Sequence, residues 1–357
     1  MQAVLVHEWL TNMAGSEKVV AALRGAFPGA PLYTSMRWAP AFPDWEAVHT
    51  SFLQPFARGA RSHVRVLPAM PAAFRSLRLP PAPVTITSFH TFATWARPHR
   101  SSAHIVYCHT PPRFLWVADQ LHREQAIPAA RRTLAVVGRP LRRLDRWRAA
   151  LPAVMVANSR AVADRIRRAY GRTAVVVHPP VDVDRFAAAR AGEPDDYFLL
   201  ISRLVPYKQV DIAVEAFAEL GWRLVIAGVG RQEEALRAVA PPNIEFVGFV
   251  PDDELPGLIA KARALVMPGE EDFGITPVEA MAAGTPVVAL GRGGAVDTVR
   301  PELSGLLYDE PDTRSLVTAL RKAAAMSWDR NAISASVRHF DEARFVAEIT
   351  DLASSLV

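Results

Sequence analysis

Residues 264–290, ALVMPGEEDFGITPVEAMAAGTPVVAL, join two short apolar runs through a segment with helical capping signals. The runs ALVMP and PVVAL are typical of buried strands, which are short and bounded by Pro or Gly. Between them, capping chemistry predicts a helix with Thr276 as its N-cap and Gly284 just past its end. Pro277 and Glu279 would then be its first and third residues. Strand, helix and strand in this order predict a parallel β-α-β unit.

Strand-like and helix-like segments alternate along the rest of the chain in the same way. Five apolar runs of the first half are predicted strands: 3–7, 84–88, 105–108, 154–157 and 175–178. Helices are predicted to begin near Ser16 and near Ser159, where NSRAVADRIRRAYG has an N-cap, a helical period and a closing glycine. In the second half, YFLLISR, WRLVIAG and IEFVGFV alternate with helices such as VDIAVEAFAEL. The pattern predicts an α/β protein with parallel sheets.

The length of 357 residues favours two domains, because one hydrophobic core rarely grows this large. Residues 178–196, HPPVDVDRFAAARAGEPDD, are rich in proline and charge and are predicted to be an interdomain linker. We expect two doubly wound, Rossmann-like domains, the first over 1–185 and the second starting at 186. Ligands in such folds lie beyond the carboxyl ends of the strands, so two facing domains would hold theirs in the cleft between them.

Charge narrows the choice of partners. The net charge is +5, and the basic excess gathers in two arginine clusters of the first half. The clusters are Arg58, Arg61, Arg65, Arg75 and Arg78, and then Arg131, Arg132, Arg139, Arg142, Arg143, Arg146 and Arg148. Such a surface suits nucleic acid, anionic lipid or a phosphorylated substrate, or it is a solvated face of an arginine-rich protein.

Cysteine content and apolar runs bear on location. Cys108 is the only cysteine, which excludes an internal disulfide and a cysteine-rich metal site and fits a reducing cytoplasm. The N-terminal MQAVLVHEWL lacks a basic region and carries Glu8, unlike a signal peptide. No apolar run reaches the ~20 residues that span a bilayer. We expect a cytoplasmic protein.

Charged residues follow two predicted strands of the second half. Arg203 and Lys208, in SRLVPYKQ, lie just beyond a strand, and a guanidinium with an ammonium suits an anion such as a diphosphate. The loop after ALVMP carries Glu271 and Gly274 before a helix N-terminus, which favours negative charge. Glu271 and Glu279 are expected to meet different parts of one extended ligand.

The first half offers a matching edge. Gly15 and Ser16 lie between a strand and its helix, in a place suited to phosphate contact. His109 follows a strand directly in YCHTPPRFLW, which raises the odds of a functional over a purely structural role.

Three other patterns have simpler interpretations. Gly228 and Gly230 give only G-x-G, which a short glycine turn explains. Asp182 and Asp184, followed by arginine, are interpreted as turn and capping residues. The acidic run at 270–272 could bind a hard cation, but no second ligand cluster supports it, so no metal is required.

The ordered motifs of the second half resemble those of retaining glycosyltransferases of family 4, which have the GT-B fold. They are SRLVPYKQVDIAVEAF, VIAGVG, IEFVGFVPDDEL, EDFGITPVEAMAAGTPVVAL and GGAVDTV. VHEWLTNMAGSEKVV, TSFLQPFARGAR, YCHTPPRFLW and VANSRAVADRI are similar to the branch of bacterial mannosyltransferases that act on lipid-linked sugars in surface polysaccharide assembly. The resemblance implies a donor domain over 186–335 and a C-terminal helix, 336–357, that crosses back onto the first domain.

The resemblance also implies roles for the candidate residues. Arg203 and Lys208 would hold the donor diphosphate and stabilise its charge as it leaves. Glu271 would contact the donor sugar. Gly15 and Ser16 would approach the phosphates from the first domain.

The remaining implied contacts involve the donor and the acceptor. Backbone N–H groups would meet the sugar hydroxyls and the diphosphate from Phe273, Gly274, Ile275 and Thr276. Glu279 would accept hydrogen bonds from the ribose, and His109 would touch the sugar and help to orient the acceptor. The resemblance implies front-face substitution through an oxocarbenium-like transition state, with Glu271 positioning the sugar rather than attacking it. No metal or other cofactor is implied.

The chain departs from the branch pattern at three places. Val117 stands where an aspartate is common, with Asp119 two residues later. Asp297 replaces a glutamate, and Asp272 replaces a glycine beside Glu271. The first change bears on acceptor choice and the last on the fit of the donor sugar.

Three functions remain to be compared. The resemblance favours a hexosyltransferase that moves mannose from GDP-mannose to a lipid-linked saccharide or related acceptor, with the basic first domain on an anionic membrane. An alternative is a same-fold transferase that uses a UDP- or ADP-sugar and a soluble acceptor. A non-catalytic binder of sugar nucleotides or nucleic acid is less favoured, because a pure binder has little need of the full set of charged residues; nucleic acid is therefore not an expected partner.

Overall fold

A computed structural model describes residues 1–117, 128–190 and 192–357 of the chain. The described residues form two compact units. Unit 1 comprises residues 1–117, 128–180 and 342–357, and unit 2 comprises 181–190 and 192–341. The chain passes between units at 180/181 and 341/342, where the sequence predicts boundaries at 185/186 and 335/336.

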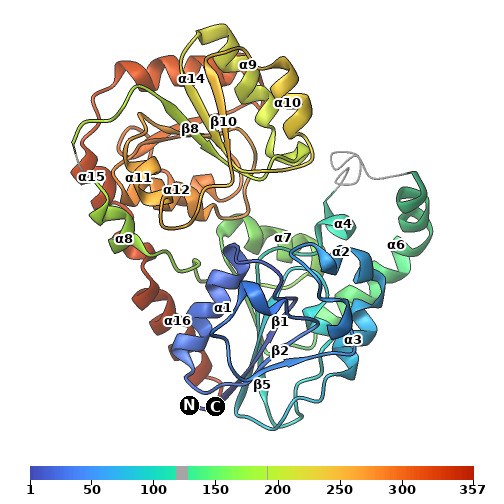
Figure 1. Ribbon diagram of the computed structural model, residues 1–357. Helices are drawn as coiled ribbons and strands as arrows, with labels where there is room; N and C mark the ends of the chain where they lie inside the picture. The colour runs from blue at the N-terminus through green and yellow to red at the C-terminus, as the bar shows by residue number, and fades with distance from the viewer. Residues whose placement is uncertain (118–127, 191) are drawn as a thin grey trace. The chain divides into compact units, whose positions relative to one another are not determined.

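Unit 1 is built on a seven-stranded parallel sheet (Figure 1). Its order is β3-β2-β1-β4-β5-β6-β7. The strands are β1 (Ala3–His7), β2 (Leu32–Thr34), β3 (Val48–Thr50), β4 (Val84–Phe89), β5 (Ala103–Cys108), β6 (Val154–Ala157) and β7 (Val175–Val176). The five strands predicted for this half are all present, β7 in shortened form. The prediction missed β2 and β3, which have three residues each and therefore little periodicity to detect.

Helices cover both faces of this sheet. They are α1 (Gly15–Ala26), α2 (Ser62–Val66), α3 (Met70–Ser76), α4 (Arg113–Trp116), α6 (Pro128–Ala149), α7 (Arg160–Tyr170) and α16 (Glu342–Ser354). One core joins the sheet to α1 and α16 and the other joins it to α3 and α7. The predicted caps of α7 are confirmed: the Ser159 hydroxyl accepts from Val162 N–H, and Gly171 ends the helix with φ of 67°.

The C-terminal helix α16 belongs to unit 1, although it follows unit 2 in the sequence. It lies beside α1 (Figure 1). Phe345, Ile349 and Ala353, one face of the helix, are buried in the same core as Val19 and Leu23 of α1. Burial of this apolar stripe is what holds the chain terminus on the first sheet.

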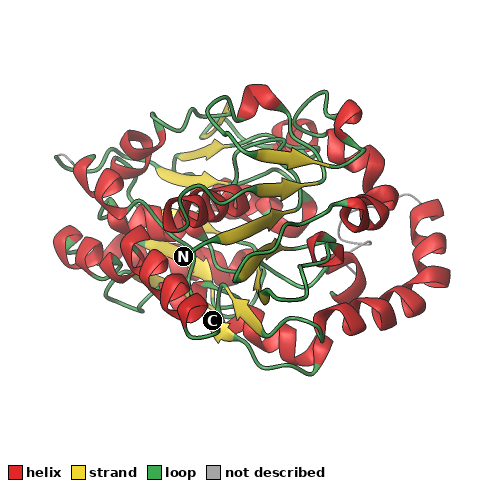
Figure 2. Ribbon diagram, turned by 90° about the horizontal axis from the view of Figure 1, so that it is seen from below, coloured by secondary structure: helices red, strands yellow, loops and turns green. Residues whose placement is uncertain are grey.

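Unit 2 contains a six-stranded parallel sheet of order β10-β9-β8-β11-β12-β13. The strands are β8 (Phe198–Ile201), β9 (Leu224–Ala227), β10 (Ile244–Gly248), β11 (Leu265–Met267), β12 (Val287–Leu290) and β13 (Gly305–Tyr308). Its helices are α8 (Val183–Ala188), α9 (Val210–Leu220), α10 (Glu233–Val239), α11 (Leu255–Ala260), α12 (Ile275–Ala282), α13 (Ala295–Thr298), α14 (Thr313–Ala325) and α15 (Arg330–Ala335). Helices flank the strands (Figure 2). The β-α-β unit of residues 264–290 is thus β11-α12-β12, with parallel strands in register.

The predicted linker at 178–196 is wrong in its middle. Helix α8 lies there, and its Val183 and Phe186 are buried in the unit 2 core with Leu199 and Val225 of the sheet. Helix α8 has only six residues, too few to show a helical period in the sequence, and it is flanked by proline and charged residues.

Strand order reverses once in each sheet. In unit 2 the reversal lies between β8 and β11, and in unit 1 between β1 and β4. Loops leaving neighbouring strands part at such points, which makes the carboxyl edge there the usual position of a ligand in doubly wound sheets. Among the described residues, none of the helices combines the length and the apolar character needed to cross a bilayer.

Candidate functional site

The β8–β11 edge of unit 2 carries the charged residues that the sequence singles out. Arg203 and Lys208 follow β8, and Glu271 follows β11, so the reversal of strand order brings the two loops together. Lys208 Nζ donates a hydrogen bond to the Glu271 carboxylate. The Lys208 side chain is 13% exposed and the Glu271 side chain 22%, so the pair is sheltered but reachable from solvent.

Tyr207 lies between the two cations of this edge. Arg203 is exposed and donates from Nη2 to the Tyr207 hydroxyl. The Arg203 Cζ atom is 5.9 Å and the Lys208 Nζ atom 5.2 Å from the centre of the Tyr207 ring. Cations within about 6 Å of an aromatic face are attracted to it. Tyr207 is not among the residues predicted for the site, although an aromatic residue beside Lys208 in SRLVPYKQ was a signal.

Two glycines in the loop after β9 fix the position of the loop that carries Arg203. A Cβ on Gly228, where φ is +133°, would lie 1.9 Å from the Ser202 carbonyl oxygen, and one on Gly230 would lie 2.2 Å from that of Leu204. Ser202 N–H donates to Ala227 O at 3.0 Å and Leu204 N–H to Val229 O at 3.1 Å. The sequence interpretation of a simple glycine turn was therefore incomplete, because these glycines allow two backbones to touch.

Three more glycines support the Glu271 loop in the same manner. A Cβ on Gly269 would lie 2.7 Å from the Lys208 carbonyl oxygen. One on Gly293 would lie 2.1 Å from Glu271 O, and one on Gly294 would lie 2.2 Å from Phe273 Cα. Gly294 N–H also donates to Glu271 O at 2.9 Å. Gly293 and Gly294, which begin the motif GGAVDTV, thus pack directly against the backbone of the Glu271 loop.

The helix after Glu271 begins two residues earlier than predicted. Gly274, not Thr276, is the N-cap of α12, with φ of +88°, and Ile275 is the first helical residue. The left-handed conformation of Gly274 lets the chain enter the helix at Ile275, before the position at which the Thr276 side chain could cap it. Since Gly274 has no side chain to cap with, the first amides of α12 and its positive dipole end suit an anion.

The other predicted donor residues divide between edge and core. Ile275 and Thr276 are half-buried at the start of α12. Phe273 is 3% exposed and packs edge-on against Phe340 with ring centres 5.5 Å apart, so its side chain belongs to the core. Glu279 is 5% exposed, one turn into α12.

In unit 1 the predicted residues lie at the β1–β4 edge and beside it. His109 follows β5, and its Nε2 lies 2.8 Å from the Ser88 hydroxyl at the end of β4. Gly15 is exposed and Ser16 half-buried at the start of α1, and the Ser16 hydroxyl donates to Glu17 at 2.9 Å. Glu17 had no predicted role; it lies in the polar start of α1, before the apolar run that begins at Val19.

Glu8 and His7 are further buried polar residues that the sequence analysis left without a role. Both have 0% exposure at the end of β1. Glu8 Oε1 accepts from the backbone N–H groups of His90, Thr91 and Phe92 at 3.0, 2.6 and 2.9 Å. The sequence HEWL was a signal for this role, because the ionisable residues His7 and Glu8 come where the apolar strand β1 ends.

The interpretation of Asp182 is confirmed. Its side chain caps α8 by accepting from Arg185 N–H at 3.2 Å. Asp184 forms an ion pair with Arg338 on the surface. Within residues 1–117, 128–190 and 192–357, no three His, Cys, Asp or Glu side chains are arranged to hold a metal ion. Asp119 lies outside the residues that the structure describes.

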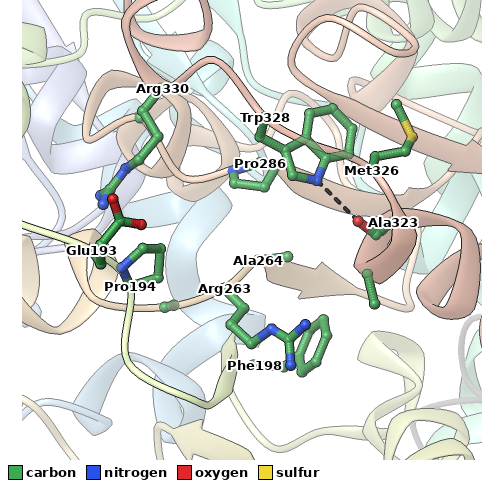
Figure 3. A pocket seen from close by; sticks show the side chains of 13 residues that line it. Glu193, Pro194, Phe198, Arg263, Ala264, Pro286, Ala323, Met326, Trp328 and Arg330 are labelled. Atoms are coloured by element: carbon green, nitrogen blue, oxygen red, sulfur yellow. Dashed lines mark hydrogen bonds between the residues drawn. The ribbon is translucent and has the colours of Figure 1, made fainter.

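A separate cavity of about 200 Å³ lies at the opposite, amino edge of the unit 2 sheet (Figure 3). Phe198 at the start of β8 lines it, together with Ala264 and Pro286, which precede β11 and β12. Trp328 covers one side and donates to Ala323 O at 3.0 Å. Because it lies at the amino ends of the strands, this cavity is distinct from the site at their carboxyl ends, the β8–β11 edge.

Sequence comparison gives the β8–β11 edge a family context. Residues 181–340 match the family described as glycosyl transferases group 1. A GDP-mannose-dependent α-(1-6)-phosphatidylinositol monomannoside mannosyltransferase of Mycolicibacterium smegmatis is 35% identical over 47% of this chain and 54% of its own. A D-inositol 3-phosphate glycosyltransferase of Nocardioides sp. is 34% identical over 45% and 43%. The chain spans about half the length of these curated relatives.

Solved structures resemble the chain over its whole length. Sucrose-phosphate synthase (tll1590) from Thermosynechococcus elongatus has a TM-score of 0.76 at 18% identity, with 100% of this chain and 99% of that chain covered. Anabaena Alr3699/HepE in complex with UDP-glucose has a TM-score of 0.72 at 18% identity, with 99% and 100% covered. At these identities the likeness concerns the fold, and it confirms the predicted α/β GT-B class with two Rossmann-like domains.

Proposed function

We propose that this protein is a retaining glycosyltransferase of family 4 that transfers a hexose from a nucleotide sugar. The observation that carries the proposal is the pairing of Lys208 with Glu271 at the β8–β11 edge, beside Arg203 and the N-terminus of α12. Two cations and a helix N-terminus suit a diphosphate, and the carboxylate suits sugar hydroxyls.

Donor binding would exchange the partners of Lys208. The diphosphate would compete with Glu271 for the ammonium group, and the released carboxylate would accept hydrogen bonds from the sugar. The bond from the anomeric carbon to the phosphate oxygen would break while the acceptor oxygen bonds to the same face. The acceptor proton would pass to that phosphate oxygen. Lys208 and Arg203 would stabilise the charge that develops on the leaving diphosphate, without need of a metal ion.

GDP-mannose is the proposed donor, and a lipid-linked saccharide or related molecule of polysaccharide biosynthesis the proposed acceptor. The similarity to a GDP-mannose-dependent mannosyltransferase supports this choice. The alternative is a UDP- or ADP-sugar with a soluble acceptor, which the similarity to a protein that holds UDP-glucose favours.

Unit 1 would bring the enzyme to the cytoplasmic face of a membrane. Phe52, Phe56 and Val64 are 55%, 54% and 50% exposed, and the exposed Arg58 and Arg61 lie among them in the sequence. Apolar side chains set among arginines suit the interface of an anionic bilayer.

Thermal-shift screening against GDP, UDP, ADP and their sugars tests the donor, because a ligand that binds only the folded state raises the melting temperature. We expect the largest rise with GDP or GDP-mannose, and slow donor hydrolysis without acceptor. A larger rise with a UDP- or ADP-sugar supports the alternative donor. No shift with any nucleotide contradicts the transferase proposal, and a shift without hydrolysis or transfer supports a non-catalytic binder.

Flotation with anionic liposomes separates the two acceptor classes. We expect the protein to float with anionic vesicles and to sink with neutral ones, as binding through arginines requires. A protein that sinks in both cases favours the soluble acceptor.

A further inference from the structure

A buried line of hydrogen bonds runs through unit 1 from the start of α1 to His109. Glu17 Oε1 lies 3.4 Å from His7 Nε2, and His7 Nδ1 lies 3.0 Å from the Ser88 hydroxyl. Ser88 in turn lies 2.8 Å from His109 Nε2. We call Glu17, His7, Ser88 and His109 the His7 relay. Glu17 is 2% exposed and His7 and Ser88 are fully buried, so water has little part in it.

Glu17 is the charged end of the relay. Burial alone would raise the pKa of Glu17, but the hydrogen bond and charge of His7 and the hydrogen bond from Ser16 outweigh burial, so its pKa is lowered. Its place in the first turn of α1 adds the favourable end of the helix dipole. A carboxylate buried this deeply is stabilised by a positive charge beside it, and His7 Nε2 is the ring nitrogen that faces it.

The charge on His7 decides the direction of every other hydrogen bond in the relay. A protonated His7 donates from Nδ1 to the Ser88 oxygen, because both its ring nitrogens carry hydrogen. Ser88 has one hydroxyl hydrogen, which it then donates to His109 Nε2. Neutral His109 must therefore carry its own proton on Nδ1. A neutral His7 that donates to Glu17 would reverse this order and place the His109 proton on Nε2.

We infer that His7 is protonated beside Glu17, and that Glu17, His7 and Ser88 are positioning residues that hold His109 as the Nδ1–H tautomer. A hydroxyl fixed between two imidazole rings relays the state of one ring to the other. His90 and Tyr107 also lie near His109, with ring centres 6.2 and 5.2 Å from that of His109. Where the proposed function holds, on which this part rests, the tautomer of His109 sets the hydrogen-bonding character of a side chain proposed to touch the sugar.

Thr87 supplies a matched control on the same strand. Its hydroxyl lies 2.9 Å from His104 Nε2, in a buried bond nearly equal in length to that between Ser88 and His109. Successive residues of a strand point to opposite faces, so Thr87 acts on a different histidine. Ser88→Ala and Thr87→Val each remove one hydroxyl from an imidazole, but only the first breaks the relay.

Nitrogen-15 NMR of histidine-labelled protein measures the tautomer directly, because protonated and bare ring nitrogens differ widely in chemical shift. A His109→Gln variant identifies the His109 signals. In the parent protein we expect a protonated His7 and, at a pH where His109 is neutral, its proton on Nδ1. Ser88→Ala should move the His109 proton to Nε2, the form preferred by free histidine in water, and Thr87→Val should not.

The outcomes separate this inference from the proposed function. A neutral His7, a His109 proton on Nε2 in the parent, or no change in Ser88→Ala overturns the relay, and the parent spectrum decides even where a variant does not fold. Residues with only a structural role would lower the melting temperature without moving the tautomer. With an active transferase we also expect Ser88→Ala to lower kcat about tenfold with little change in donor KM, the effect of one hydrogen bond. A protein with the relay but without transfer activity contradicts the function and leaves the relay intact.

Discussion

The two units position their polar groups by opposite means. In unit 2, glycines let the loops after β8, β9, β11 and β12 touch through their backbones, and this contact sets where Arg203, Lys208 and Glu271 lie. In unit 1, buried side chains do the same work: Glu8 gathers three backbone N–H groups, and Glu17 and His7 lead to His109 through Ser88. The contacts in unit 2 depend on glycines, which have no side chain to keep the backbones apart. The contacts in unit 1 depend on the charge and hydrogen bonds of buried side chains. Substitutions should therefore harm the units for different reasons.

The largest expected effect concerns Lys208, the charged group that the glycine-built loops hold. Lys208→Ala should lower turnover by about 10²–10³-fold, because the cation proposed to stabilise the leaving diphosphate is lost. Steady-state transfer rates with the best donor measure the effect. Asp182→Ala is the control, since Asp182 caps α8 in the same unit and should barely affect the rate. Equal losses in both variants would mean that the diphosphate site is misassigned.

A test of the backbone contacts themselves comes next in size. Gly294→Ala places a Cβ 2.2 Å from Phe273 Cα, so the Glu271 loop must shift, at a cost of about 3 kcal/mol. Gly257→Ala is the matched control in helix α11, where a Cβ meets nothing within 4 Å. It should raise stability by about 0.4–1 kcal/mol, because alanine is the better helix former.

Urea unfolding followed by tryptophan fluorescence measures both glycine variants. If Gly294→Ala were as stable as Gly257→Ala and bound nucleotide normally, close backbone contact would not be what holds the Glu271 loop. The contrast between the two units would then fail.

The corresponding test in unit 1 removes a charge and keeps the shape. Glu8→Gln should lower the free energy of unfolding by about 1–3 kcal/mol, because its Oε2 also accepts from Phe92 N–H and an amide nitrogen there would oppose that donor. Glu348→Gln, which alters a surface pair with Arg344 on α16, should change it by less than about 0.5 kcal/mol. Melting temperatures of the two variants decide, and similar values would show that Glu8 is replaceable.

The same contrast explains how much the sequence could predict. Unit 2 was predictable because glycines and charged residues follow each strand in the chain, as in SRLVPYKQ and EEDFG. The pairing of Lys208 with Glu271 was not, because the two residues are 63 apart and only the reversal between β8 and β11 joins them. Sequence periodicity gives strand positions but not strand order.

In unit 1 the sequence predicted positions but not partners. Strand β1, helix α1 and the site of His109 were all expected. The relay was not, since Ser88 is 81 residues from His7 and a serine in a strand carries no signal of its own. Polar residues that are buried through their contacts with one another remain invisible until the strands are ordered.

The smallest expected effect concerns Asp145, a buried carboxyl group of unit 1. Its burial should make the stability of the protein depend on pH. Burial raises the pKa of Asp145 to about 6, against the lowering effect of hydrogen bonds from Trp116 and Tyr170. The folded state therefore holds a proton that the unfolded chain has released, and stability falls as pH rises from about 4 to 6.

Asp145→Asn should remove this dependence on pH. Trp116 and Tyr170 both donate to the same oxygen, Oδ2, at 2.6 and 2.9 Å, so an amide oxygen in that position keeps both bonds. At pH 8 the variant should be more stable than the parent by about 1–2 kcal/mol, because a buried charge is gone, and at pH 4 the difference should vanish. Asp164→Asn, on the surface of α7, is the control and should show no such trend. Parallel stability curves for parent and Asp145→Asn between pH 4 and pH 8 would show that Asp145 is ionised at no cost, and that burial in unit 1 weighs less on its carboxylates than we infer.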